Sequence, residues 1–156
     1  MLDHASRPVA AVPASPAVEV VTHGGFPLAY LIRHDATSEA TRFFTSDDSN
    51  FQAGFVVYPA GGQVQAHVHL PVVRRVVGTS ELLIVRSGRC TVDIYTDDRC
   101  LVASLEMLPG DAVLSVSGGH GFRMTEDTVL FEVKQGPYGG LAEKERFDTA
   151  PDGKPA

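Results

Sequence analysis

The sequence predicts an all-β domain. Short runs rich in Val, Ile, Leu, Thr and Tyr alternate with turn residues along most of the chain, which is the pattern of a β-sandwich or β-barrel. Fifteen Gly and ten Pro suit a fold with many turns. No segment carries the long apolar stripe, with residues three and four apart, that a core-facing helix needs.

Nine strands are expected, each bounded by Gly, Pro, Asp or Ser. The turns at Ser87-Gly88 and Pro109-Gly110-Asp111 have a local cause, because Gly adopts positive φ and Pro fixes φ. The expected strands span residues 28–33, 52–58, 63–69, 81–86, 89–95, 100–107, 112–116, 120–124 and 128–135. Residues 37–43 and 140–146 are the only short helical candidates.

The two cysteines flank an expected hairpin whose turn centres on residues 96–99. Such a turn pairs Cys100 with about Tyr95, and Cys90 with about Leu105 or Glu106. The two sulfurs then lie too far apart along the ladder to form a disulfide. Free thiols favour a reducing, cytoplasmic setting.

A chain of 156 residues corresponds to about one domain and is long enough to bury a core. Residues 1–18 are rich in Ala, Pro and Val without periodicity, which indicates a flexible or extended N-terminal arm. Residues 19–143 are expected to form the β-barrel domain. Residues 144–156 are polar and end in Pro-Asp-Gly-Lys-Pro-Ala, which predicts a loose C-terminal tail.

Charge and hydropathy exclude two classes of partner. The net charge is −6, and there is no cluster of Lys and Arg beyond Arg74-Arg75. Because nucleic-acid binding needs a basic surface, we expect no nucleic-acid partner. No apolar run approaches the roughly 20 residues of a membrane span, and the N-terminus lacks the pattern of a signal peptide. We therefore expect no membrane partner.

Three histidines and one glutamate are the most informative side chains. His67 and His69 are two residues apart, so they point to the same face of an expected strand. Glu81 and His120, from other strands, could complete a site of three imidazoles and one carboxylate. Such ligands suit one divalent transition metal, namely Fe, Mn, Ni, Cu or Zn.

The residues around these four resemble the two sequence motifs of the cupin superfamily, over roughly residues 50–135. The resemblance implies a cupin-type jelly-roll β-barrel with the metal on His67, His69, Glu81 and His120. An immunoglobulin-like sandwich, the alternative fold, leaves this pattern unexplained. The matching segments are Gly61, five residues and His67-Val68-His69; Glu81, six residues and Gly88; and Gly110-Asp111 with His120-Gly121-Phe122.

Three features depart from the cupin motifs. The interval from Leu70 to Ser80 is eleven residues, where three or four are usual. Val116 stands in place of a Pro, with one residue fewer between it and His120, and Met124 stands in place of an Asn. The long interval leaves open a three-histidine site without Glu81.

Strand alternation predicts which side chains surround the metal. Gln65 shares a face with His67 and His69, and Phe122 and Met124 share a face with His120, as pocket walls or simply as core. Arg74 and Arg75 lie in the apolar segment 71–79 and point in opposite directions if extended. One of them could clamp a carboxylate or phosphate, unless both are solvated surface residues.

A metal with open positions can polarise a carbonyl, activate water, or bind an enediolate or dioxygen. We therefore expect a small metal-dependent enzyme that acts on a small polar metabolite, as an oxygenase or as an isomerase or lyase. The alternative is a non-catalytic sensor that binds a sugar or an acid at the metal. The cupin resemblance also implies a homodimer, for which residues 81–86 and 18–21 supply apolar surface.

Overall fold

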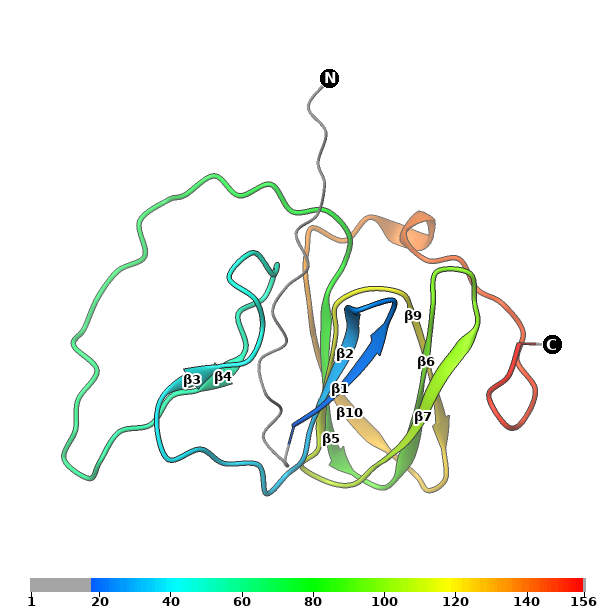
Figure 1. The fold of residues 1–156 in the computed structure, drawn as a ribbon, viewed down its shortest axis with the longest axis horizontal. Helices are drawn as coiled ribbons and strands as arrows, with labels where there is room; N and C mark the ends of the chain where they lie inside the picture. The colour runs from blue at the N-terminus through cyan, green and yellow to red at the C-terminus, as the bar shows by residue number, and fades with distance from the viewer. Residues whose placement is uncertain (1–17, 156) are drawn as a thin grey trace.

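The computed structural model describes residues 18–155 and shows an all-β fold (Figure 1). Its strands form three antiparallel sheets, none of which closes into a barrel. The described part of the chain contains one short 3-10 helix, η1, and no α-helix. The arm predicted at residues 1–18 lies outside this part, except for Val18, where the first strand begins.

The elements agree with most of the predicted strands. Seven of the expected runs contain a strand of four residues or more. The strands are β1 Val18–His23, β2 Phe26–Ile32, β3 Arg42–Phe43, β4 Gly54–Phe55, β5 Glu81–Ser87, β6 Cys90–Tyr95, β7 Leu101–Met107, β8 Ala112–Ser115, β9 Gly119–Met124 and β10 Val129–Lys134, and η1 spans Gly140–Glu143.

The large sheet has the strand order β1-β2-β8-β5-β10. The turn before β8 needs glycine at position 110, because φ is +92° there and a Cβ atom would lie 2.7 Å from the Cβ of His34. In the large sheet Glu81 of β5 pairs with Ser115 of β8 and with Lys134 of β10. Three strands therefore meet where β5 begins.

The small sheet has the order β7-β6-β9. β6 and β7 form the predicted hairpin, in which Tyr95 pairs with Leu101 and Cys90 pairs with Met107. Both cysteines are free, as predicted; Cys90 is buried and Cys100 is exposed.

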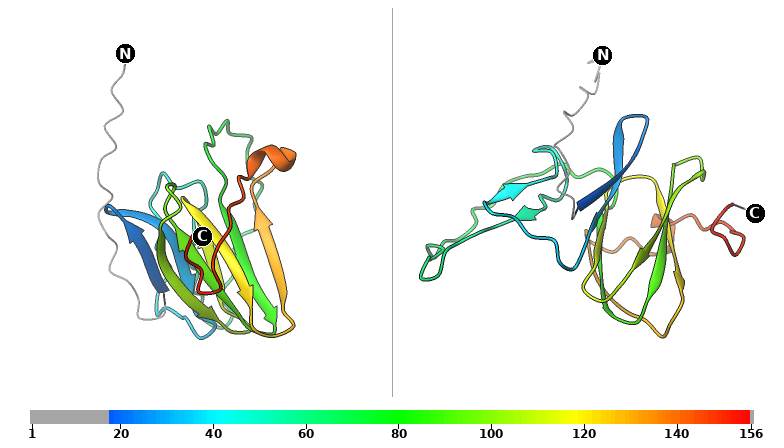
Figure 2. Two further views of the ribbon diagram at one scale, coloured as in Figure 1. Left: turned by 90° about the vertical axis from the view of Figure 1, so that its right-hand side faces the viewer. Right: turned by 60° about the horizontal axis from the view of Figure 1, so that its bottom comes forward.

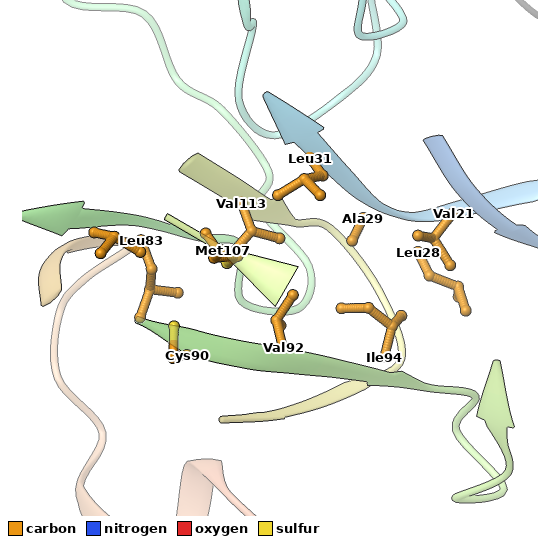
Figure 3. Packing of buried hydrophobic residues seen from close by; sticks show 11 residues of the cluster. Val21, Leu28, Ala29, Leu31, Leu83, Cys90, Val92, Ile94, Met107 and Val113 are labelled. Carbon is orange, nitrogen blue, oxygen red and sulfur yellow. The ribbon is translucent and has the colours of Figure 1, made fainter. Parts of the chain in front are cut away.

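The main core lies between the inner faces of the large and small sheets (Figure 3). Leu31 and Leu83 of the large sheet and Val92 and Ile94 of the small sheet are almost fully buried. Full burial of an aliphatic side chain of this size stabilises a fold by about 1.5–3 kcal/mol. The two layers seen in Figure 2 are therefore held together chiefly by apolar contact.

A second cluster covers the outer face of the large sheet. Tyr30 and Leu114 pack there against Phe44 and Phe55, from the segment that contains β3 and β4. The rings of Tyr30 and Phe44 lie 5.6 Å apart between centroids. This segment therefore covers part of the outer face of the large sheet. Within the described residues, its two short strands pair only with each other.

Two predicted strands did not form as expected. Of residues 52–58 only Gly54 and Phe55 lie in a strand, and residues 63–69 lie in none. A strand needs a partner for its N–H and C=O groups, and the segment 56–80 runs away from the sheets instead (Figure 1). With these strands unpaired, the sheets stay open, so the predicted jelly-roll barrel is not confirmed.

Of the two predicted helices, the first does not form and the second is shorter than predicted. Residues 37–43 contain no helix and end in β3. Of residues 140–146, only Gly140–Glu143 are helical, as a single 3-10 turn. Neither segment has an apolar stripe to bury, so neither gains the packing that stabilises short helices.

The C-terminal segment packs against the outer face of the small sheet, where the sequence predicted a loose tail (Figure 2). The Tyr95 hydroxyl donates a hydrogen bond to the Gly153 carbonyl at 2.6 Å. The Phe147 ring meets the Tyr95 ring edge to face, with centroids 5.1 Å apart, and Arg123 donates to the Pro151 carbonyl at 3.0 Å. These contacts fold the chain end back over β6 and β9.

Candidate functional site

A cavity of about 710 Å³ lies beside Glu81 and His120, and this volume is in the range of small-molecule sites. It opens between the start of β5, the end of β8, the start of β9 and the segment that follows η1. Its wall is about equally polar and apolar, and several polar and charged side chains contribute to it. They include Glu81, Ser115, His120, Lys144 and Arg146.

Glu81 is buried at the end of this cavity, with 4% of its surface exposed. Strand alternation turns it inward with Leu83 and Val85, which belong to the main core. One carboxylate oxygen, Oε1, lies 3.0 Å from Lys144 Nζ, and the other, Oε2, lies 3.0 Å from His120 Nε2. The buried charge is therefore paired, as burial requires.

His120 faces the same interior from the opposite sheet. It pairs in register with Ile94, and Phe122 pairs with Val92, so both point toward the core as predicted. The Phe122 ring lies 5.9 Å from the His120 ring between centroids and lines the cavity. Met124 shares this face at the far end of β9, but it is half exposed and lies outside the cavity wall.

The protonation states of the pair differ. Burial alone would raise the pKa of Glu81, but the Lys144 hydrogen bond and the nearby positive charges outweigh it and lower the pKa below its ordinary value. Burial lowers the pKa of His120, and Glu81 only partly offsets this effect. At neutral pH the site therefore holds an ionised carboxylate beside a neutral imidazole.

Ser115 adds an unsatisfied hydrogen-bonding group. Its hydroxyl is buried and lines the cavity, and it has no hydrogen-bond partner among the residues described. Ser115 lies directly across the sheet from Glu81. Because an unpaired buried hydroxyl costs about 1–3 kcal/mol, this oxygen is suited to bind a polar ligand.

His67 and His69 lie elsewhere, on the segment 56–80. Every residue from 56 to 79 is exposed. The two imidazole rings lie 5.0 Å apart between centroids, and His67 Nδ1 contacts the Gln65 carbonyl oxygen at 2.9 Å. The two rings therefore lie close to each other, but they are on no strand and the structure does not bring them to Glu81 and His120.

The other predicted pocket residues on the segment 56–80 also lie away from Glu81 and His120. Gln65, Arg74 and Arg75 are exposed on the segment 56–80 and do not line the cavity. Across residues 18–155, no group of three or more His, Cys, Asp or Glu side chains is placed to hold a metal. The structure thus joins two of the four predicted ligands.

Sequence reasoning missed Lys144, Arg146 and Ser115. Lys144 and Arg146 come from the predicted loose tail, whose return over the sheets leaves no periodic signal in the sequence. Ser115 could have been found from strand alternation, had the pairing of β8 with β5 been known.

No family model, curated protein or solved structure matches this chain. Among residues 18–155 there is no helix with the length and apolar character needed to cross a bilayer.

Proposed function

We propose that the cavity around Glu81 and His120 is the site of a small metal-dependent enzyme that acts on a small polar metabolite. The observation that carries the proposal is the buried pair itself, an ionised carboxylate against a neutral imidazole at 3.0 Å. These are the protonation states that metal ligands require. A bound divalent metal would supply a Lewis acid for isomerase or lyase chemistry, or, if it is Fe, Mn or Cu, a redox-active centre for oxygenase chemistry.

The spacing of the two atoms fits a shared metal. Nitrogen and oxygen ligand atoms lie about 2.1 Å from a bound metal ion. Two neighbouring ligand atoms at right angles around the metal are then about 3 Å apart, which is close to the distance between Glu81 Oε2 and His120 Nε2. Lys144 contacts the other oxygen, Oε1. Glu81 can therefore keep its lysine partner while Oε2 faces a cation.

The open edge of β9 supports the participation of His67 and His69. β9 pairs with β6 on one side and with no strand of the described chain on the other. An unpaired edge is a template for strand addition. If residues 63–69 paired there with their histidines inward, His67 and His69 would face the same interior as His120.

The exposed apolar surface of the segment 56–80 also favours its packing against the edge of β9. Valines, a leucine and a tyrosine of this segment lie in solvent, which is unfavourable for a large contiguous set. They are Val56, Val57, Tyr58, Val64, Val68, Leu70, Val72, Val73, Val76 and Val77. Packing of this segment against the sheet edges would bury apolar area and close the barrel that the sequence predicts.

Metal content of single variants tests the proposal. Protein purified without a metal-chelating tag and refolded with Fe, Mn, Ni, Cu or Zn should bind about one metal per chain. His69→Ala and His120→Ala should each lower occupancy severalfold, whereas His23→Ala, on the exposed β1–β2 hairpin, should not. Wild-type protein that stays metal-free with all five metals would contradict the proposal.

A second candidate is a binding module without catalysis. Lys144 already neutralises Glu81, so the cavity is electrostatically complete for a polar ligand even without a metal. Screens with oxygen consumption and with sugar or sugar-acid turnover separate the candidates, because a sensor binds its ligand and leaves it unchanged.

A further inference from the structure

A smaller cavity of about 160 Å³ lies beside the large one, between the end of β10 and the chain that follows it. Its wall contains three cationic side chains, Lys134, Lys144 and Arg146, together with Tyr138 and Gly140. Lys144 and Arg146 also line the large cavity, so the two spaces adjoin. We call Lys134, Lys144 and Arg146 the basic pocket.

Three acids near the pocket already have partners of their own. The Glu143 carboxylate accepts a hydrogen bond from the Gly139 amide, and Glu145 pairs with Arg99. Glu81 is shared between His120 and Lys144. Besides Glu81, the carboxylates of exposed Glu132 and of Glu143 are close enough to raise the pKa of Lys144.

The cations keep donors for a ligand. A lysine ammonium has three N–H donors, and the described contacts of Lys144 use one of them, toward Glu81. Arg146 makes no ion pair with any residue that the structure describes. The ammonium of Lys134 lies over the Tyr138 ring at 4.8 Å from its centroid, which holds it at the pocket while leaving its N–H groups free of a carboxylate.

We propose that the basic pocket binds the anionic group, a carboxylate or a phosphate, of the small molecule whose polar part lies against Glu81, His120 and Ser115. The inference rests on the proposed function only in taking the large cavity as the site. Arg146 suits the role because its planar guanidinium can donate two parallel hydrogen bonds to an oxyanion. In a chain of net charge −6, three converging cations form a local attraction for an acidic ligand.

The shared position of Lys144 gives this pocket a link to the site. Its ammonium contacts Glu81 and lines both cavities. A ligand that binds Lys144 through its anionic group can therefore extend its other atoms into the large cavity. The proposed substrate class is a small polar acid or phosphorylated metabolite.

Calorimetric titration with inorganic phosphate and with malonate tests the inference, at low ionic strength and with sodium chloride as the control salt. Wild-type protein should bind at least one of these anions. Arg146→Gln and Lys134→Gln should each weaken binding by about tenfold, the loss of roughly one charged hydrogen bond. Arg86→Gln removes an exposed cation at the other end of β5 and should leave binding unchanged. Preference for phosphate or for malonate identifies which anionic group the pocket takes.

The inference would be overturned if wild-type protein bound neither anion at tens of millimolar. It would also be overturned if wild type and both pocket variants bound the anions equally well. His120→Ala separates this failure from that of the proposed function. The variant should lose metal and still bind the anion, because His120 does not line the basic pocket. If the wild-type protein takes up no metal but binds the anion, and Arg146→Gln loses that binding, the inference is supported and the metal proposal is contradicted.

Discussion

Asp111 shows how a single buried carboxylate holds a turn. Only 1% of its surface is exposed. Oδ1 accepts a hydrogen bond from the His34 amide at 2.8 Å, and Oδ2 accepts from the Leu108 amide at 3.0 Å and from the Arg33 guanidinium at 3.1 Å. These contacts tie the turn before β8 to the end of β2.

Asp111→Asn should destabilise the fold by about 2 kcal/mol, because an amide replaces one acceptor oxygen by a donor and removes the charge that Arg33 contacts. Urea denaturation measures this loss as a lower midpoint with an unchanged slope. Asp35→Asn, at an exposed neighbouring position, is the matched control and should be within about 0.5 kcal/mol of wild type. Equal losses in the two variants would show that the buried contacts contribute nothing.

The same carboxylate should make stability depend on pH. Burial alone would raise the pKa of Asp111, but the amides of Leu108 and His34 and the Arg33 guanidinium outweigh it and lower the pKa. The stabilisation is complete above the unfolded-state pKa of about 3.9 and is lost as pH falls through the lower folded-state pKa. The free energy of unfolding should therefore fall more steeply with acid in wild type than in Asp111→Asn. Parallel curves below about pH 5 would contradict this assignment.

Glu81 is the predicted ligand that the structure places best. Glu81→Gln keeps the shape and removes the charge, so metal affinity should fall severalfold while the fold stays intact, as measured by metal titration and circular dichroism. Glu39→Gln, on an exposed bend, should leave the affinity unchanged. Unchanged affinity in Glu81→Gln, beside a clear loss in His69→Ala, would assign the metal to three histidines without the glutamate.

At the scale of elements, the C-terminal segment should be held by its contacts with β6. Tyr95→Phe removes the hydrogen bond to Gly153 and should cost about 1 kcal/mol. Trypsin should then cleave faster after Arg146, because local opening governs proteolysis. Tyr58→Phe, at an exposed tyrosine, should change neither quantity. A Tyr95→Phe variant with wild-type stability and cleavage rate would show that the hydrogen bond does not hold the segment.

The strands from β5 to β10 were predictable because their signals are local. Glu81–Ser87 alternates buried and less buried positions, and turns at Gly88 and Gly110 with positive φ separate the strands as expected. Residues 63–69 have the same local character, but a strand also needs a neighbour. That requirement depends on contacts far away in the sequence, so composition alone could not decide it.

The part of the candidate site that lies on strands was predictable from the sequence, and the part that lies on the C-terminal segment was not. Glu81 and His120 meet because adjacent positions in each strand alternate between faces, which the sequence shows. Lys144 reaches Glu81 only through the return of the chain after β10, and no spacing rule encodes that return. The basic pocket was missed for the same reason.

At the scale of the whole molecule, we propose that two copies associate through the outer face of β5 and β10. Phe131 and Val133 are exposed there beside Ile84, with 53% and 42% of their surfaces in solvent. Sedimentation at micromolar concentration should give about twice the chain mass of 16.7 kDa. Phe131→Glu should shift the protein toward monomer, whereas Phe26→Glu, at an equally exposed residue in the β1–β2 hairpin, should not. A wild-type mass near 16.7 kDa would contradict the dimer.

The central claim is that His67 and His69 join Glu81 and His120 around one metal. X-ray absorption fine structure at the edge of the bound metal tests it most directly, because scattering from imidazole rings counts the histidine ligands. We predict about three imidazoles per metal in wild type and about two in His69→Ala. A spectrum with a single imidazole, unchanged by His69→Ala, would show that His67 and His69 do not reach the metal and would contradict the account.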